Sequence, residues 1–331
     1  MKIGKRIVAA FAATAIGALA LTGCSGGDED ASNGDDLIVV GFVAVGPEGA
    51  WRAANEANVQ ATFTEEAGFD LKYAPAANLD QKSQIDAFTA FVDEGVDIIL
   101  LSATEASGWE ASLERAQEAE IPVILVDRGI EPDDTSLYVT RIAPDNFVVA
   151  QSVGQWAVDE AAAAGEALNY YILEGPIGVG VVNERNDGWD DVTDGNENLV
   201  RIGAQTANWS AEEGKSVFET VLKSNDNDIQ LVFAQNDEMG LGAALAVEEA
   251  GLVPGVDVKI ATIDGTIGAM EALAEGDLSF VAEYNPLFGE TLLDVVETVL
   301  AGGTVDSYII VPSGTFDSPE AAQEALPSRE Y

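Results

Sequence analysis

Short apolar segments alternate with longer amphipathic segments along most of the chain. The apolar segments are short and rich in Val, Ile and Leu, which is typical of buried strands. The segments between them carry apolar residues at helical spacing, as Ile85, Phe88 and Val92 do. In the first half this pattern predicts strands at 37–43, 69–73, 98–101, 123–126 and 137–140, and helices at 51–67, 82–94 and 108–119.

The same alternation restarts after residue 146 and continues to residue 283. It predicts helices at 147–164, 185–199, 211–223, 241–250 and 267–275, and strands at 169–173, 200–205, 231–234, 259–263 and 279–283. Strands that are apolar at nearly every position, separated by helices, indicate a parallel sheet with helices on both faces. The sequence therefore predicts an α/β protein with two parallel sheets in series.

The N-terminus has the pattern of a lipoprotein export signal. Three basic residues precede an apolar run at 7–21, whose last residue begins the segment Leu21-Thr22-Gly23-Cys24. The small residues before Cys24 leave its sulfur accessible to acylation, and Cys24 is the single cysteine of the chain. We therefore expect a signal peptide at 1–23, a lipid on Cys24 and a flexible acidic linker at 24–36. The alternative is an ordinary secretory peptide that happens to end near a cysteine.

The charge balance excludes several partners. Removal of residues 1–23 takes away three of the 15 basic residues and none of the 58 acidic ones, so the formal charge goes from −43 to −46. Such a surface repels phosphate backbones and anionic lipid headgroups, which argues against binding to nucleic acid. Membrane contact is therefore expected through the lipid on Cys24, which places the mature protein outside the cytoplasm, anchored to the cell membrane.

The composition also excludes most catalytic sites. The chain has no histidine and no second cysteine, so it lacks a Ser-His-Asp triad, a Cys-His pair, a histidine-ligated zinc and a redox dithiol. The glycine-rich run at 174–182 has Asn183 in place of the third glycine of a dinucleotide loop, and no GK[ST] follows it. We therefore expect no cofactor, no metal and no enzymatic activity.

Polar residues follow the predicted strands, some directly and others further along the chain. In open α/β sheets, ligands bind beyond the carboxyl ends of the strands, so these positions are candidates for one site. The candidates are Trp51, Arg52, Asp127, Arg128, Arg185, Asn236 and Asp264. Arginine, aspartate and asparagine provide the fixed hydrogen-bond geometry that distinguishes sugar hydroxyls, and an indole covers an apolar sugar face. Taken singly, each has a structural explanation as an ion pair, a helix N-cap, a core residue or a solvated charge.

Several segments together resemble a known family. The matching segments are 40–60, 95–130, 136–146, 174–185, 234–255 and 263–265, and they include GAWRAA, VDRGI, QNDEMGLGA and IDG in that order. They resemble the solute-binding proteins of bacterial ABC sugar importers, in the ribose-binding-like class of type I periplasmic binding proteins, and most closely the galactofuranose-binding members. Gln235 and Trp209 depart from that pattern, because relatives often carry histidine and another aromatic residue there.

The resemblance implies two Rossmann-like lobes joined by a three-segment hinge that close on a monosaccharide. It implies a first lobe at 37–142 and 285–305 and a second lobe at 143–284 and 306–331. It adds Asn146 and Asn285 to the candidate site residues. It further implies a monomer that delivers a galactofuranose-, galactose- or arabinose-like aldose to an ABC permease.

Two other functions remain as alternatives. A sensory co-receptor would present the bound sugar to a membrane kinase or chemoreceptor. A carboxylate-based glycoside hydrolase would use paired acids such as Asp127 and Asp264. A repressor of related fold is excluded by the export signal and by the absence of a basic DNA-binding headpiece in the sequence.

Overall fold

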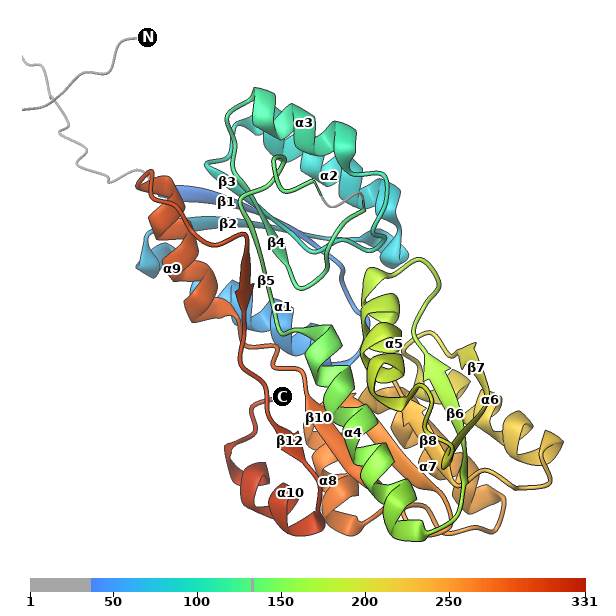
Figure 1. The fold of residues 1–331 in the computed structure, drawn as a ribbon. Helices are drawn as coiled ribbons and strands as arrows, with labels where there is room; N and C mark the ends of the chain where they lie inside the picture. Colours follow the sequence, from blue (N-terminus) through green and yellow to red (C-terminus); the bar gives the residue numbers. More distant parts are fainter. Residues whose placement is uncertain (1–36, 132–133) are drawn as a thin grey trace, which may run out of the picture. The chain divides into compact units, whose positions relative to one another are not determined.

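Two α/β units, each built on its own sheet, make up the computed structural model, which describes residues 37–131 and 134–331 (Figure 1). The first sheet has the strand order β11-β5-β4-β3-β1-β2. Its strands are β1 (Ile38–Ala44), β2 (Phe69–Pro75), β3 (Ile98–Leu101), β4 (Val123–Val126), β5 (Thr140–Ala143) and β11 (Tyr308–Ile310). All of its pairings are parallel. We call this sheet and the helices that cover it lobe 1.

The second sheet repeats this plan in the order β12-β10-β9-β8-β6-β7. Its strands are β6 (Leu168–Glu174), β7 (Leu199–Thr206), β8 (Leu231–Ala234), β9 (Lys259–Asp264), β10 (Phe280–Glu283) and β12 (Thr315–Phe316). Only the short β12 runs antiparallel to its neighbour among the described strands of this sheet. We call this sheet and its helices lobe 2. The predicted fold of two α/β lobes with parallel sheets is confirmed.

The helices lie between the strands, as the periodicity predicts (Figure 1). In lobe 1 they are α1 (Ala50–Thr62), α2 (Gln81–Glu94), α3 (Glu110–Glu118) and α9 (Gly289–Leu300). In lobe 2 they are α4 (Asn146–Ala164), α5 (Gly180–Thr193), α6 (Ala211–Ser224), α7 (Asp237–Glu249), α8 (Ile267–Glu275) and α10 (Pro319–Ala325). Within the described residues, no helix is long and apolar enough to cross a membrane.

The chain passes from one sheet to the other in three places. It leaves lobe 1 between β5 and α4, returns between β10 and α9, and leaves again between β11 and β12. One predicted boundary is wrong, because β11 pairs with β5 through Ile309 and Ile142. Residues 308–310 therefore belong to lobe 1, although the sequence analysis assigns 306–331 to lobe 2.

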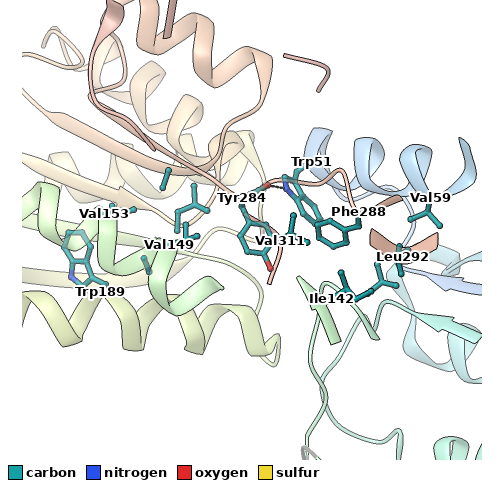
Figure 2. Close-up of a cluster of buried hydrophobic side chains, with 14 of the residues drawn as sticks. Trp51, Val59, Ile142, Val149, Val153, Trp189, Tyr284, Phe288, Leu292 and Val311 are labelled. Atoms are coloured by element: carbon teal, nitrogen blue, oxygen red, sulfur yellow. Dashed lines mark hydrogen bonds between the residues drawn. The ribbon is translucent and has the colours of Figure 1, made fainter. Parts of the chain in front are cut away.

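An apolar cluster continues from one lobe to the other through these passages (Figure 2). Tyr284, Phe288 and Val311 lie in the passages and are all buried. Figure 2 shows Trp51 beside Tyr284 and Phe288, with Val149 on the other side of Tyr284. The ring centroids of Trp51 and Tyr284 are 5.3 Å apart. The segment that enters α9 is therefore packed into the core at the point where the lobes meet.

Two predicted elements are displaced in the structure. The strand predicted at 137–140 lies at Thr140–Ala143, since it is Ile142 that pairs with Val126 of β4. The helix predicted at 185–199 is α5 at Gly180–Thr193. It ends early because Gly195 follows with a φ of 80°, and Leu199 already belongs to β7.

Candidate functional site

A cavity of about 40 Å³ lies at the carboxyl ends of the strands, with walls from both lobes. Its lining contains seven of the sequence-predicted residues, namely Trp51, Arg52, Asp127, Arg128, Arg185, Asn236 and Asp264. The lining is completed by Glu48, Val181, Trp209, Glu238 and Tyr284. A larger cavity of about 360 Å³, lined by Arg141, Glu184 and Tyr308 among others, contains none of the predicted residues. The sequence candidates therefore converge on one small, polar cavity.

The wall from lobe 1 is an array of two arginines and two carboxylates. Arg52 on α1 pairs with Asp127, which follows β4, and its Nη1 lies 3.2 Å from Ser102 Oγ. Arg128 pairs with Glu48 and donates to the carbonyl of Ala103 at 3.3 Å. These side chains are fixed by several partners each, so their remaining hydrogen-bonding groups face the cavity in a set orientation.

The wall from lobe 2 is organised around Arg185 on α5. Its Nε donates to Asn146 Oδ1 at 3.0 Å and its Nη1 donates to the carbonyl of Gln235. Its Nη2 lies 3.7 Å from Asp264 Oδ1. The guanidinium also lies 4.9 Å from the ring centroid of Tyr284, which adds a cation–π contact. Arg185 is therefore almost fully engaged before any ligand arrives.

The two aspartates of the cavity have opposite electrostatic environments. Burial alone would raise the pKa of Asp127, but the guanidiniums of Arg52 and Arg128 outweigh it and hold that pKa below its usual value. Burial raises the pKa of Asp264 well above its usual value, and the single nearby cation Arg185 does not offset it. Two cations therefore stabilise the anion of Asp127, whereas burial disfavours the anion of Asp264.

The lining carries four carboxyl groups and three guanidiniums. The two kinds of group differ by only one, so the charges of the lining nearly balance. A net anion such as a phosphate would find no surplus of positive charge here. The cavity is therefore matched to a neutral polar ligand.

Aromatic rings cover two sides of the cavity. Trp51 is fixed because its indole N–H donates to the carbonyl of Tyr284, as drawn in Figure 2. Trp209 packs over Gly175, where a Cβ would come within 2.0 Å of the indole. Within the part of the chain that the structure describes, the indole N–H of Trp209 and the Nε of Arg52 are buried and have no hydrogen-bond partner. Both residues line the cavity, so these two unpaired N–H groups are candidate donors to a ligand.

Two contacts between side chains of one lobe and groups of the other join the lobes. Glu238 on α7 accepts from the backbone N–H of Ala50, the first residue of α1, at 2.8 Å. Arg141 on β5 makes a bidentate ion pair with Glu184 on α5, at 2.8 and 3.1 Å. Both bonds depend on how close the lobes are, so they belong to the arrangement in which the cavity is narrow.

Two predicted residues lie outside the lining. Asn146 is buried behind it, where its Nδ2 donates to Glu184 at 2.7 Å and to the hydroxyl of Tyr284 at 3.0 Å. Asn285 uses its side-chain oxygen to accept from the N–H of Leu287 at 3.0 Å, which shapes the turn into α9. Both residues support the cavity from outside in this structure. Cys24 and the export signal lie outside the described residues.

Some residues of the lining also have the purely structural role that the sequence analysis left open. Asn236 is the N-cap of α7 and accepts from Met239 N at 3.0 Å. Trp51 is both a core residue and part of the lining. Asp264 is not an N-cap, because Thr266 caps α8.

Sequence reasoning missed Tyr284 and Glu238. Tyr284 directly follows β10, so the rule applied to the other strand ends would have found it. Its hydroxyl donates to Asp127 at 2.9 Å. Glu238 is the fourth residue of the loop predicted at 235–240, and its contact with Ala50 depends on the approach of lobe 1.

Comparison with known proteins agrees with this geometry. Residues 40–304 match the periplasmic binding protein domain family. A fructose import binding protein of Bifidobacterium longum is 44% identical over 330 residues, covering 98% of each chain. A galactofuranose-binding protein of Escherichia coli is 35% identical and covers 88% of this chain and 92% of its own.

A solved structure gives the same result. A Mycobacterium smegmatis protein in complex with β-D-fucofuranose superimposes with a TM-score of 0.84 at 40% identity, covering 89% of this chain and 96% of that one. The fold therefore recurs in this relative, and this chain belongs to the periplasmic binding protein domain family.

Proposed function

We propose that this protein captures a neutral monosaccharide in its furanose form and delivers it to an ABC permease. The observation that carries the proposal is the convergence of buried arginines, carboxyl groups and aromatic rings on one small cavity of nearly balanced charge. Hydroxyl groups need both donors and acceptors, and this set supplies both. The relatives named above are binding proteins, which favours capture over turnover.

The residues would divide the work by chemistry. The free N–H groups of Arg52 and Trp209 would donate to ring or hydroxyl oxygens. Asp264 has few protein partners and would exchange hydrogen bonds with hydroxyls. The faces of Trp51 and Trp209 would cover the C–H surface of the sugar.

The relatives widen the range of sugars beyond the aldoses that the sequence analysis favours. One is a fructose import binding protein, another binds galactofuranose, and the solved relative holds a fucofuranose. The feature these sugars share is the five-membered ring that they adopt in whole or in part. A site that selects this ring has an apparent affinity reduced by the fraction of sugar in that form. We therefore expect the tightest apparent binding for sugars with a large furanose fraction.

Capture and delivery would be linked through the approach of the lobes. A sugar that touches Arg128 in lobe 1 and Asp264 in lobe 2 stabilises the arrangement in which both are close to it. The permease would then recognise the paired lobes. A lipid on Cys24 would keep the protein near that permease on the outer side of the cell membrane.

Isothermal titration calorimetry tests the proposal. The panel contains D-fructose, D-galactose, L-arabinose, D-ribose and D-xylose, with fructose 6-phosphate as the charged control. We expect heat from at least one of the furanose-forming sugars and none from the phosphate. Tight binding of the phosphate or of an amino acid, with no heat from the neutral sugars, would contradict the proposal.

A further inference from the structure

The backbone at Asp264 has an unusual conformation. Asp264 has a φ of 137°, a region that residues with a side chain rarely adopt, and Gly265 follows with a φ of 85°. This turn directs the carboxyl group of Asp264 into the cavity at the end of β9. A conformation of this kind persists only when surrounding contacts hold it.

Those contacts come from Asp237, a buried residue at the start of α7 that does not line the cavity. Its Oδ2 accepts from the backbone N–H of Gly265 at 2.9 Å and from the N–H and hydroxyl of Thr266 at 2.7 and 2.8 Å. Its Oδ1 accepts from the hydroxyl of Thr262 at 2.7 Å. One carboxyl group therefore binds both backbone amides that follow Asp264.

Helix α7 is placed so that this carboxyl group reaches the turn. Gly240 lies against β9, where a Cβ would come within 2.1 Å of the Thr262 side chain. The close approach of helix and strand leaves Asp237 fully buried beside the turn. The carbonyl of Asp264 accepts from Tyr284 N at 2.9 Å. This bond fixes the end of β9 but does not hold the two amides that follow Asp264.

We propose that Asp237 is a positioning residue of the sugar site, which acts on the ligand only by holding the Asp264–Thr266 turn. The inference rests on the proposed function insofar as it concerns affinity. Without Asp237, the turn would relax toward an ordinary backbone conformation, and the carboxyl group of Asp264 would leave its place in the cavity. The ligand would then lose its contact with Asp264 on lobe 2.

The test compares Asp237→Ala with Thr262→Val as its matched control. Thr262→Val keeps the shape of the side chain and removes one hydrogen bond from the same buried carboxyl group, but it leaves the bonds to the turn. The affinities for D-fructose, L-arabinose and D-galactose are measured by calorimetry at a temperature where all variants are folded. We expect Asp237→Ala to weaken binding ~10- to 100-fold and Thr262→Val to change it less than about twofold.

Asp237→Asn serves as the conservative variant. Its amide oxygen still accepts from Gly265 and Thr266, so we expect affinity within about fivefold of the unmodified protein. If Asp237→Ala does not fold, Asp237→Leu replaces it, because leucine is similar in size to aspartate and has no acceptor. Equal affinity losses in the control and in the variants without an acceptor would overturn the inference.

Hydrogen exchange supplies a readout that needs no sugar. The amides of Gly265 and Thr266 should exchange at least ~10-fold faster in Asp237→Ala than in the unmodified protein, and should stay protected in Thr262→Val. Unchanged protection in Asp237→Ala would overturn the inference even if affinity fell. If the unmodified protein bound none of the sugars, the proposed function would fail, and the exchange rates would still decide whether Asp237 holds the turn.

Discussion

The hydrogen bond between Glu238 and Ala50 should favour the arrangement in which the lobes are close together. Helix α1 begins after Gly49, which has no side chain to cap it, and the Glu238 carboxylate of lobe 2 accepts from the first amide instead. The approach is close, because a Cβ on Gly49 would lie 2.6 Å from Glu238 Oε1. We predict that removing either partner weakens sugar binding through the approach of the lobes.

The magnitude follows from the type of bond. A hydrogen bond to a charged group contributes about 1.5–3 kcal/mol, and a carboxylate at a helix N-terminus adds about 0.3–1 kcal/mol. Glu238 is half-buried and Ala50 is exposed, so solvent competes for both, and we take about 1–2 kcal/mol. If the lobes are mainly apart in the ligand-free protein, the free energy of sugar binding loses the whole contribution of this bond. The affinity is then roughly 5- to 30-fold weaker.

The experiment removes the donor and the acceptor separately. Ala50→Pro deletes the N–H at the first helical position, where proline is well tolerated because that amide has no partner within the helix. It leaves the cavity wall unchanged. Glu238→Ala deletes the acceptor. Calorimetry should show the same loss of sugar affinity in each single variant and in the double variant, because all three lack the same hydrogen bond.

Two results would refute the reasoning. Additive losses in the double variant would mean that the two residues act independently. A loss in Glu238→Ala with none in Ala50→Pro would mean that Glu238 acts within lobe 2, by touching the sugar or by holding Asn236 in the lining. The melting temperature of each ligand-free variant serves as the control for damage to the fold.

Three further predictions concern the anchor, the site and the effect of pH. Cys24→Ser should move the protein from the membrane pellet to the soluble fraction with sugar affinity unchanged; a variant that still sediments after a high-salt wash would rule out the lipid anchor. Arg128→Ala and Asp264→Ala should each weaken sugar binding by about 2–5 kcal/mol, the usual cost of leaving a buried charged partner unpaired, while the ligand-free melting temperature falls little; loss of folding with binding retained would show that both residues are structural. Burial raises the pKa of Asp237 to about 7 and that of Asp264 well above its usual 3.8, so the folded state holds protons that the unfolded state releases. This contribution to stability is complete below about pH 4 and is lost as the pH rises toward 7 and beyond, so melting temperatures from pH 5 to pH 8 should fall less steeply in Asp264→Asn; equal slopes would contradict the raised pKa.

The sequence predicted the two sheets because buried parallel strands are apolar at nearly every position. It misplaced β5, because Leu137 and Tyr138 are apolar for another reason: both pack against the core of lobe 1 without belonging to a strand. It also misplaced α5, because the predicted helix began only after the glycine-rich run at 174–182, whereas α5 begins at Gly180. Gly188 lies inside the helix, where a Cβ would come within 2.2 Å of the Phe147 carbonyl on α4. Close packing between helices requires glycine there, and that requirement is visible only in three dimensions.

The candidate site was more predictable than these boundaries. The rule that ligands bind beyond the carboxyl ends of strands needs only the strand ends, and Asp127, Arg128 and Asp264 follow directly from it. Asn146 and Asn285 came from resemblance alone, and both lie outside the cavity lining. The contact of Glu238 could not be predicted, because its partner Ala50 is 188 residues away in the sequence.

Tyr284 has a consequence for attempts to change what this protein binds. Its carbonyl accepts from Trp51, its hydroxyl bonds to Asp127 and Asn146, and its amide bonds to the Asp264 carbonyl. A substitution at any of these partners therefore disturbs the passage between the lobes as well as the cavity wall. The side chain of Val181 lines the same cavity and takes no part in this set of hydrogen bonds. An engineer who wants a sensor for a new sugar, with lobe movement intact, should randomise Val181 first and leave the neighbours of Tyr284 unchanged.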